Sequence, residues 1–377
     1  MSTGPFPAPG EVRRVLVRDE PFHRDFQDAV RSLPGYASMG IALVDLTGAA
    51  PRYAATPQEH FDKHVFSVAK LAPFLAAFRL RERLRNQFSG DPAKDSEELI
   101  GKIDKTWKPL IAARVSSRVA KPDFPNLRRI FDFGGPPTPG GWKFDFKGDH
   151  SGHDTDREKL VWKYLGGLDR RYRGFVPKDE VDLLPFMHRL KLMVRMSDDM
   201  SAGSVASDVG LAYTFGVMVS DGLYNEKGRH GMWLSNTYGY DSKFSGFEGS
   251  GTDLTAGATA YAVAEYLTRL HQKALVDKES SERMLDILKE RSGRGLGTES
   301  RFQGLPTGRA THSKIGLWRP TGNTSEGAIV QSFGRTRGGV LKPVRYVAVG
   351  LQDLGGANMF SLVNRMDAYV KKVNGLT

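Results

Sequence analysis

The sequence predicts a mixed α/β (α+β) fold: an antiparallel five-stranded sheet flanked by N- and C-terminal helices, with a mostly helical subdomain. Apolar or alternating runs bounded by Gly-rich turns predict strands at both ends of the chain, over 39–47, 53–55, 311–319, 327–335 and 344–352. Helical spacing of apolar residues predicts terminal helices over 20–33 and 358–373. The chain between these two sets of strands is mostly helical, so strands from both ends must meet in one sheet.

This pattern predicts three parts. Residues 1–19 are rich in Pro, Gly and charge and are expected to form an N-terminal arm. A discontinuous sheet domain takes 20–84 and 250–377, and the helical subdomain takes 85–249. Pro34-Gly35 ends the first helix, and Asn358 is expected to cap the last one.

A helix following Ser67 carries the first chemical signal. Leu71, Phe74 and Phe78 lie at helical spacing, and Ser67 stands where an N-cap serine is favoured. Lys70 is one turn later, so its amine and the Ser67 hydroxyl share a helix face. A neutral lysine can take the proton of a serine and make it a nucleophile. Pro73 conflicts with a regular helix from Ser67, so we expect an irregular first turn or a kink.

Two later stretches complete a pattern. Met196-Ser197-Asp198-Asp199 follows an amphipathic segment over 183–196, and Thr311-His312-Ser313-Lys314-Ile315-Gly316-Leu317-Trp318 follows a loop rich in Gly and Arg. In the order S-x-x-K, S-D-x and K-x-G, the three stretches resemble the motifs of the serine β-lactamase and penicillin-binding-protein superfamily. The resemblance covers most of 20–84 and 190–377.

The resemblance implies roles for particular residues. Ser67 would be the acylated nucleophile, and Lys70 its base or electrostatic partner. Ser197 would shuttle a proton, while the charge of Lys314 would favour a neutral Lys70 and attract an anionic substrate. The backbone N–H groups of Ser67 and Leu317 would form an oxyanion hole, worth about 3 kcal/mol for each donor. Asp199, Ile315 and Gly316 would lie in the substrate site.

The chain departs from the family pattern at three places. Asp199 stands where asparagine is usual, and a carboxylate there favours charged Lys70. Ile315 replaces a Thr or Ser hydroxyl that helps to hold a substrate carboxylate. No Glu-x-x-Leu-Asn occurs in the loop 224–252, where Glu226 and Glu248 have the wrong context. We therefore do not expect efficient turnover of β-lactams.

The Ser67–Ser197 separation is longer than a compact member of the superfamily requires, which predicts an insertion near 88–160. Within it, residues 149–156 hold two histidines and three aspartates. These types can bind a divalent metal, but the spacing is not that of a helical pair, and a polar surface loop is favoured. We expect no metal and no cofactor.

Charge and termini bear on the partners. The net charge of +11 raises the alternative of a nucleic-acid-binding protein, with basic density at 79–85 and 170–173. Each cluster contains or adjoins an acidic residue, and no nucleic-acid motif is present, so nucleic acid is disfavoured. The N-terminus lacks a signal-peptide pattern and no run is long enough to span a membrane. These features predict a cytoplasmic protein without a membrane partner, unless a leader has been removed.

Three hypotheses remain. The first is a β-lactamase-like serine hydrolase that forms an acyl-enzyme on a small amide or ester. The second is a catalytically inactive protein of the same fold that binds a ligand, and the third is the basic nucleic-acid-binding protein. The sequence does not indicate an oligomeric state.

Overall fold

The computed structural model describes residues 4–8, 10–115, 122–134, 141–149, 178–228, 230–238, 256–289, 300–301, 305–318 and 320–377. The chain forms two compact units. The helical unit comprises Met1–Val12, Lys70–Asp221 and Leu234–Phe247, and the sheet unit comprises Arg13–Ala69, Gly222–Trp233 and Glu248–Thr377. The boundaries predicted from the sequence, at 84 and 250, stay a prediction.

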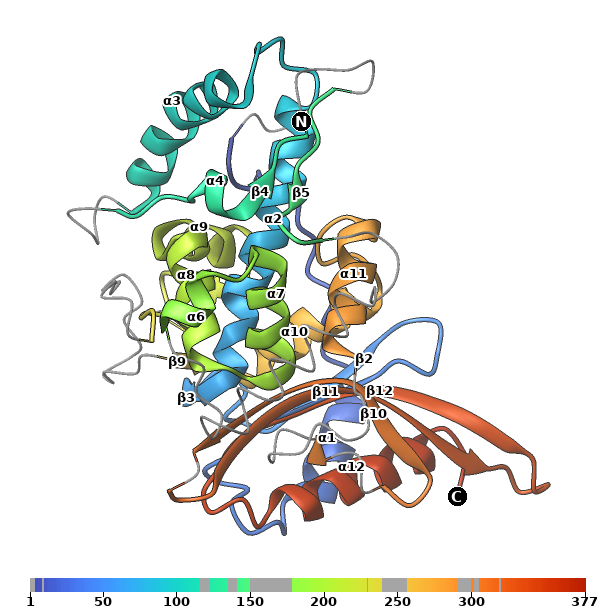
Figure 1. The fold of residues 1–377 in the computed structure, drawn as a ribbon. Helices are drawn as coiled ribbons and strands as arrows, with labels where there is room; N and C mark the ends of the chain where they lie inside the picture. Colours follow the sequence, from blue (N-terminus) through green and yellow to red (C-terminus); the bar gives the residue numbers. More distant parts are fainter. Residues whose placement is uncertain are drawn as a thin grey trace. The chain divides into compact units, whose positions relative to one another are not determined.

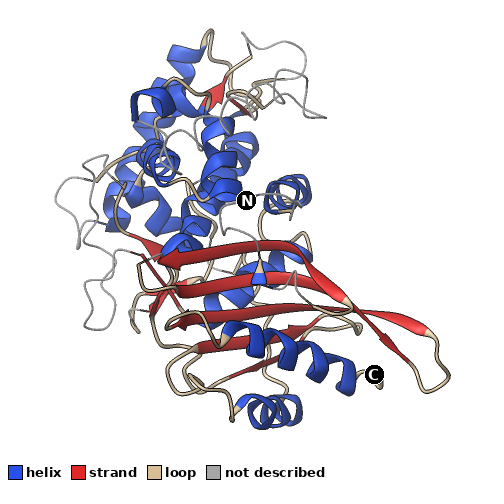
Figure 2. Cartoon of the chain, turned by 60° about the horizontal axis from the view of Figure 1, so that its bottom comes forward, coloured by secondary structure: helices blue, strands red, loops and turns tan. Residues whose placement is uncertain are grey.

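The sheet unit contains the predicted five-stranded antiparallel sheet, with strand order β10-β11-β12-β1-β2 (Figures 1 and 2). The predicted fold class is therefore confirmed. The strands are β1 (Gly40–Asp45), β2 (Arg52–Ala55), β10 (Gly308–Trp318), β11 (Asn323–Arg335) and β12 (Leu341–Asp353). Strands from the two ends of the chain join where β1 pairs with β12, from Gly40 opposite Leu351 to Asp45 opposite Tyr346.

Helices cover both faces of this sheet. The predicted terminal helices, α1 (Glu20–Val30) and α12 (Met359–Val373), pack on one face, and α10 (Ala260–His271) lies on the other beside α11 (Lys278–Leu288) (Figure 1). All six residues of β1 are buried, because both of its faces are covered. Apolar residues of α1, α12 and the sheet form one continuous core.

Short polar contacts fix the ends of these helices. The Asp19 side chain caps α1 by accepting from the Phe22 backbone N–H at 3.1 Å. α10 begins at Ala260 and is capped by Thr259, whose side chain accepts from the Ala262 backbone N–H at 3.1 Å. At α12 the first N–H is bound by Asp353 and not by Asn358, whose side chain makes no capping bond. Asn358 therefore occupies the expected N-cap position, but its side chain does not make the capping hydrogen bond.

Smaller strands lie near the start of the Ser67 segment. β3 (Lys63–His64) pairs with β9 (Ala256–Ala258), which is followed in the same small sheet by β8 (Trp233–Leu234). β6 (Tyr224–Asn225) pairs with β7 (His230–Gly231).

The helical unit is built around α2 (Leu71–Phe88), which is buried on nearly all sides. α8 (Asp199–Val209) and α9 (Leu211–Ser220) pack against it, and α3 (Ser96–Val115) packs on α9. The remaining elements are α4 (Leu127–Ile130), β4 (Phe131–Asp132), β5 (Asp145–Phe146), α6 (Lys178–Asp182) and α7 (Phe186–Lys191), followed by a π-helical turn η2 (Leu192–Met196). The single helix expected over 183–196 is thus a short α-helix that widens into the π-turn. By length and apolar composition, no single described helix spans a membrane; α8 and α9 pass only as a pair bent by 80°.

The basic cluster at 79–85 serves this packing. Arg79, Arg81 and Arg83 are only 6%, 3% and 5% exposed. Arg79 binds both carboxylate oxygens of Asp221, at 2.6 and 3.1 Å. Buried arginines bound in this way cannot form a phosphate-binding surface, and the second basic cluster at 170–173 lies outside the described residues.

The predicted N-terminal arm is divided between the two units: its described residues up to Val12 pack in the helical unit, whereas Val15 and Leu16 donate to Glu265 of α10 in the sheet unit. Phe6 stacks on Tyr213 at a ring-centroid distance of 5.5 Å, and the Gly4 carbonyl accepts bonds from Arg83 and Gln87. Gly216 of α9 makes room for this ring, because a Cβ there would lie 2.3 Å from Phe6.

Candidate active site

The Ser67 turn differs from the predicted capped helix. Phe66–Lys70 form a 3₁₀ turn, η1, and α2 begins only at Leu71. Ser67 is therefore not an N-cap residue; Lys70 occupies that position and makes no capping bond. Pro73 falls in the first turn of α2, where its missing N–H breaks no helical hydrogen bond. The expected irregular first turn is thus confirmed. Residues three apart in a 3₁₀ helix lie one above the other, so Ser67 and Lys70 share a side of the turn.

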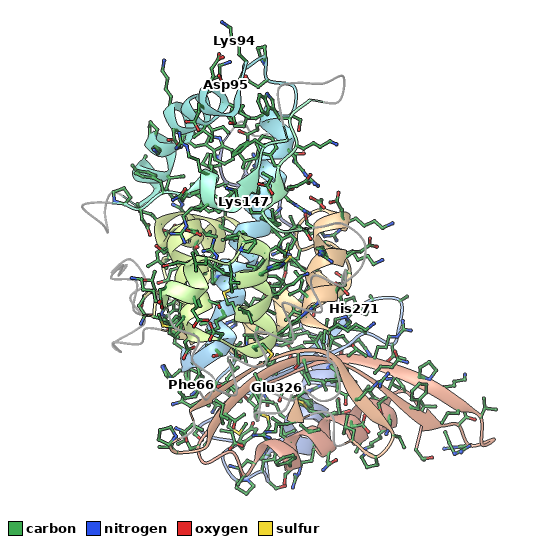
Figure 3. The ribbon with its side chains drawn as sticks, viewed as in Figure 1. Phe66, Lys94, Asp95, Lys147, His271 and Glu326 are labelled. Carbon is green, nitrogen blue, oxygen red and sulfur yellow. The ribbon has the colours of Figure 1, made fainter. Side chains whose placement is uncertain are left out.

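The residue before Ser67 has a strained backbone. Phe66 adopts a φ of +49°, a left-handed conformation that is uncommon for an aromatic residue. The preceding chain is held firmly: the Val65 N–H donates to Ala256 at 3.3 Å, and Ser325 of β11 donates to the His64 carbonyl at 3.3 Å. The His64 and Phe66 rings meet edge to face at 4.3 Å, and Figure 3 labels Phe66 beside the sheet. Strain that neighbours maintain in this way is typical of functional turns.

Strand β10 lies directly against this turn. A Cβ atom at Gly316 would lie 2.1 Å from the Val65 carbonyl oxygen and 3.0 Å from the Ser67 nitrogen. Only glycine fits such an approach. β10 is an edge strand of the sheet, and the Ser67 turn covers it at Gly316. The sheet unit thus brings Ser67 next to the K-x-G motif.

Lys314 belongs to the same strand face. Side chains two apart on a strand point the same way, so Lys314 lies on the face where Gly316 meets the Ser67 turn. Lys314 is 2% exposed, and its Nζ lies 3.1 Å from the Ile315 carbonyl. Ile315 points to the opposite face and is also buried. The substrate contacts predicted for Ile315 and Gly316, and the oxyanion role predicted for Leu317, stay predictions.

The helical unit brings Lys70 together with the S-D-x motif. The Lys70 ammonium, fully buried, donates to the Ser197 carbonyl at 2.6 Å and to Asp199 at 2.5 Å. Ser197 follows the π-turn η2 with a left-handed φ of +56°, and Asp198 caps α8 by accepting from Ser201 at 2.6 Å. The Tyr238 ring centre lies 5.1 Å from the same ammonium. Two oxygens and a π face therefore surround one buried cation.

Opposing effects act on this cation. Burial lowers the pKa of Lys70, because a charged amine is costly away from water. The Asp199 carboxylate acts in the other direction and favours the ammonium. Burial raises the pKa of Asp198. Asp199 is 37% exposed, so solvent screens its charge in part.

The sequence pointed to most of these residues but not to all of their contacts. It assigned the Ser197 hydroxyl a proton-shuttle role, whereas the Ser197 group that meets Lys70 is the backbone carbonyl. Tyr238 and His64 were missed, since a lone aromatic residue in a loop or short strand carries no motif. The sequence indicated Gly316 only as the glycine of the K-x-G motif and did not predict its close approach to the Ser67 turn.

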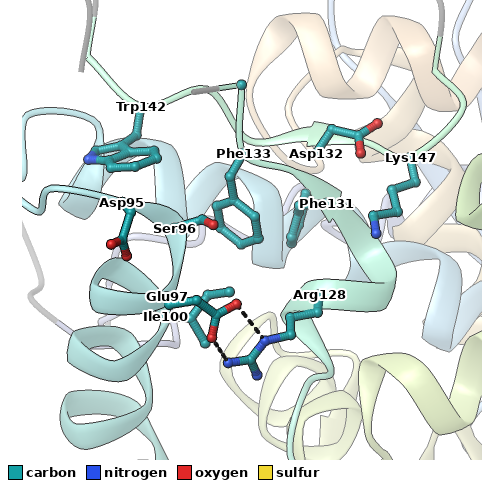
Figure 4. Close-up of a pocket in the computed structure, with 11 residues that line it drawn as sticks. Asp95, Ser96, Glu97, Ile100, Arg128, Phe131, Asp132, Phe133, Trp142 and Lys147 are labelled. Carbon is teal, nitrogen blue, oxygen red and sulfur yellow. Dashed lines mark hydrogen bonds and ion pairs between the residues drawn. The ribbon is translucent and has the colours of Figure 1, made fainter. Parts of the chain in front are cut away.

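A separate pocket lies in the insertion of the helical unit (Figure 4). Its volume is about 480 Å³, and an ion pair between Arg128 and Glu97 lies on one rim. Aromatic side chains of β4 and its neighbours, Phe131, Phe133 and Trp142, form its apolar lining. None of the predicted catalytic residues lines this pocket. Of the loop 149–156, only Asp149 is described, and no described cluster of three acidic, His or Cys residues suits a metal.

Comparisons with known proteins place this geometry in a family context. A model of the "Beta-lactamase enzyme family" matches residues 172–337, which include Ser197, Asp199 and the Lys314 motif but not Ser67 or Lys70. The chain therefore resembles the serine β-lactamase superfamily, as its motifs predict, and this supports a serine hydrolase-like function. No curated protein matches the chain.

Several solved structures are similar at low identity. A β-lactamase from Chitinophaga pinensis is 12% identical, with 94% of this chain and 100% of that chain covered and a TM-score of 0.47. A class A β-lactamase from Bacteroides cellulosilyticus is 12% identical over 94% of this chain and 97% of that one, with a TM-score of 0.46. The TLA-3 extended-spectrum β-lactamase is 13% identical over 94% and 98%, with a TM-score of 0.46.

Proposed function

We propose that this protein is a serine hydrolase that forms an acyl-enzyme on Ser67 with a small amide or ester substrate. The observation that carries the proposal is the packing of Gly316 against the Ser67 turn, since it places the predicted nucleophile beside the K-x-G motif within the sheet unit. The Ser67 hydroxyl makes no hydrogen bond with another described residue and is only partly buried, which leaves it available to a substrate.

The proposed reaction has two steps. The Ser67 oxygen attacks the substrate carbonyl carbon while its proton passes to the neutral form of Lys70. The backbone N–H groups of Ser67 and Leu317 stabilise the negative charge that develops on the carbonyl oxygen. The leaving alcohol or amine takes the proton, with Ser197 as the proposed shuttle, and water then hydrolyses the ester on Ser67.

Tight recognition of penicillin-like acids is not expected, and β-lactams are not expected to be turned over efficiently. Ile315 supplies no hydroxyl for a substrate carboxylate, and its side chain is buried. The Asp199 carboxylate favours the charged form of Lys70 and so opposes the effect of burial, which is expected to slow acylation. The chain also lacks the glutamate motif that activates the deacylating water in class A enzymes.

The same ion pair favours a second candidate, an inactive protein that uses the fold to bind a ligand. A charged Lys70 that is bound by Asp199 and by the Ser197 carbonyl can stabilise the fold as a buried cation without acting as a base. The nucleic-acid alternative has no comparable support, because three arginines of the 79–85 cluster are buried.

Steady-state hydrolysis separates the two candidates. A panel of p-nitrophenyl esters and nitrocefin would be assayed with the wild type and with Ser67→Ala. The hydrolase proposal predicts ester turnover that Ser67→Ala abolishes while circular dichroism and the melting temperature stay unchanged. Turnover equal in both proteins, or absent from both across the panel, would favour the binding protein.

A further inference from the structure

The strands β11 and β12 continue beyond the rest of the sheet as a two-stranded ribbon. The pairing of β10 with β11 stops at Gly308 opposite Ser332, and the pairing of β1 with β12 stops at Asp45 opposite Tyr346. β11 and β12 stay paired as far as Arg335 opposite Leu341. Figures 1 and 2 show this hairpin running past the end of the sheet. The two strands and their turn over residues 333–343 are called the ribbon.

The ribbon has an internally braced tip. The Thr336 and Val340 backbones are bonded at 2.9 Å, and Arg335 donates to the Gly339 carbonyl at 2.9 Å. Gly339 has a φ of +81°, which favours glycine in this turn. On its outer edge, Arg335 also exchanges two backbone hydrogen bonds with the C-terminal Thr377, at 2.8 and 2.9 Å. The ribbon is therefore an ordered projection.

Its exposed side chains are cationic and apolar. Three cations of the ribbon, Arg335, Arg337 and Lys342, are exposed, and no acidic residue occurs between Glu326 and Asp353. The tip also carries adjacent apolar side chains in water: Val340 is 59% exposed and Leu341 is 53% exposed. Adjacent large aliphatic side chains exposed at a projecting tip indicate a candidate interaction site.

We propose that the ribbon docks this protein on an anionic lipid surface, with Val340 and Leu341 entering the headgroup region and the three cations facing lipid phosphates. Apolar insertion combined with basic charge is how peripheral proteins hold such surfaces. Nucleic acid would use the same cations, but it gives aliphatic side chains no burial, and the exposed part of the ribbon offers no aromatic ring for base stacking. The expectation of no membrane partner was based on the lack of a membrane-spanning segment in the sequence. Peripheral docking on a lipid surface does not need such a segment. The proposal is independent of the proposed hydrolase site.

Vesicle co-sedimentation of the full chain tests it. Wild type would be mixed with vesicles of phosphatidylcholine alone, or with phosphatidylglycerol at 30 mol%, at low and high salt. We expect binding to the anionic vesicles only, and weaker binding at high salt. The variant Arg337→Gln/Lys342→Gln should bind about 25-fold more weakly, or about fivefold for each cation. Val340→Ser/Leu341→Ser should lower binding about tenfold or more.

Matched variants elsewhere keep the test specific. Lys105→Gln/Lys278→Gln removes the same charge from exposed positions, and Val17→Ser/Leu183→Ser removes similar exposed apolar area. Both should bind as wild type. Equal losses of binding in the ribbon and control variants would overturn the proposal in favour of a general charge effect. The absence of vesicle binding by the wild type would also overturn it. Binding of a fluorescent oligonucleotide that depends on the ribbon cations but not on Val340 and Leu341, without vesicle binding, would overturn it in favour of nucleic acid.

Discussion

Replacing Asp199 by asparagine tests how the site controls its nucleophile. The change keeps the size of the side chain and removes one negative charge that lies 2.5 Å from the Lys70 ammonium. It also restores the residue that the family usually has at this position. If Lys70 takes the proton of Ser67, acylation depends on the fraction of lysine that is neutral.

The expected change in acylation rate follows from the distance and the exposure of the Asp199 carboxylate. An opposite charge within about 4–6 Å changes the population of neutral amine roughly 10- to 1000-fold. Asp199 is 37% exposed, so water screens its charge and the lower end applies. Burial of Lys70 still lowers its pKa after the substitution, because no buried atom is removed. We expect Asp199→Asn to raise the acylation rate about tenfold.

The assay is the rate at which a fluorophosphonate or an activated ester labels Ser67, followed by intact mass between pH 6 and 10. Lys70 becomes a base as it loses its proton, so the rate should rise with pH in wild type, and the variant should reach the same rate at lower pH. Asp198→Asn is the matched control, since it removes a charge one residue away and asparagine still caps α8. A variant no faster than wild type, or a gain equal to that of Asp198→Asn, would refute this reasoning.

The remaining predictions concern packing and pH. Gly316→Ala should slow labelling of Ser67 and cost about 1–3 kcal/mol in urea unfolding, because no space exists for a Cβ; Gly338→Ala, in open space, should be neutral in both assays. Arg79→Met should lower the unfolding free energy by about 3–5 kcal/mol, because the buried Asp221 loses the guanidinium that it binds. The double variant Arg79→Met/Asp221→Leu should recover much of this free energy. A double variant no more stable than the single one would contradict the ion-pair account. Burial lowers the pKa of His312 to about 4, below its ordinary value of 6.5. The unfolded state therefore takes up this proton first, and stability should be lost as the pH falls from about 6.5 to 4 by about 2–3 kcal/mol. His312→Gln should lack this loss in urea titrations, and a variant with the same pH dependence would exclude His312 as its source.

The fold was predictable because its strands carry local signals. Apolar runs at Gly40–Asp45 and Leu341–Asp353 are bounded by turn residues, and both faces of the sheet are covered, so periodicity and burial agree. Helix starts were harder to predict. Several residues near each start can serve as caps, and the tertiary structure selected Thr259 and Asp353.

The site was predictable as a set of motifs but not as a geometry. Spacing identified Ser67, Lys70 and Lys314, whereas the 3₁₀ turn and the left-handed Phe66 arise from long-range contacts with β9 and β11. The carboxylate at Asp199 was expected to oppose a neutral lysine, and its contact with Lys70 agrees with that expectation. The Tyr238 ring belongs to a loop without a sequence pattern, so its contact with Lys70 could not be predicted from the sequence.

The most direct test of the central claim is the intact mass of the protein after incubation with a fluorophosphonate and, separately, with a penicillin. The account predicts one fluorophosphonate adduct that is absent from Ser67→Ala, and any penicillin adduct should persist because deacylation is slow. A fluorophosphonate adduct that survives in Ser67→Ala, or no adduct from either reagent, would contradict Ser67 as the nucleophile.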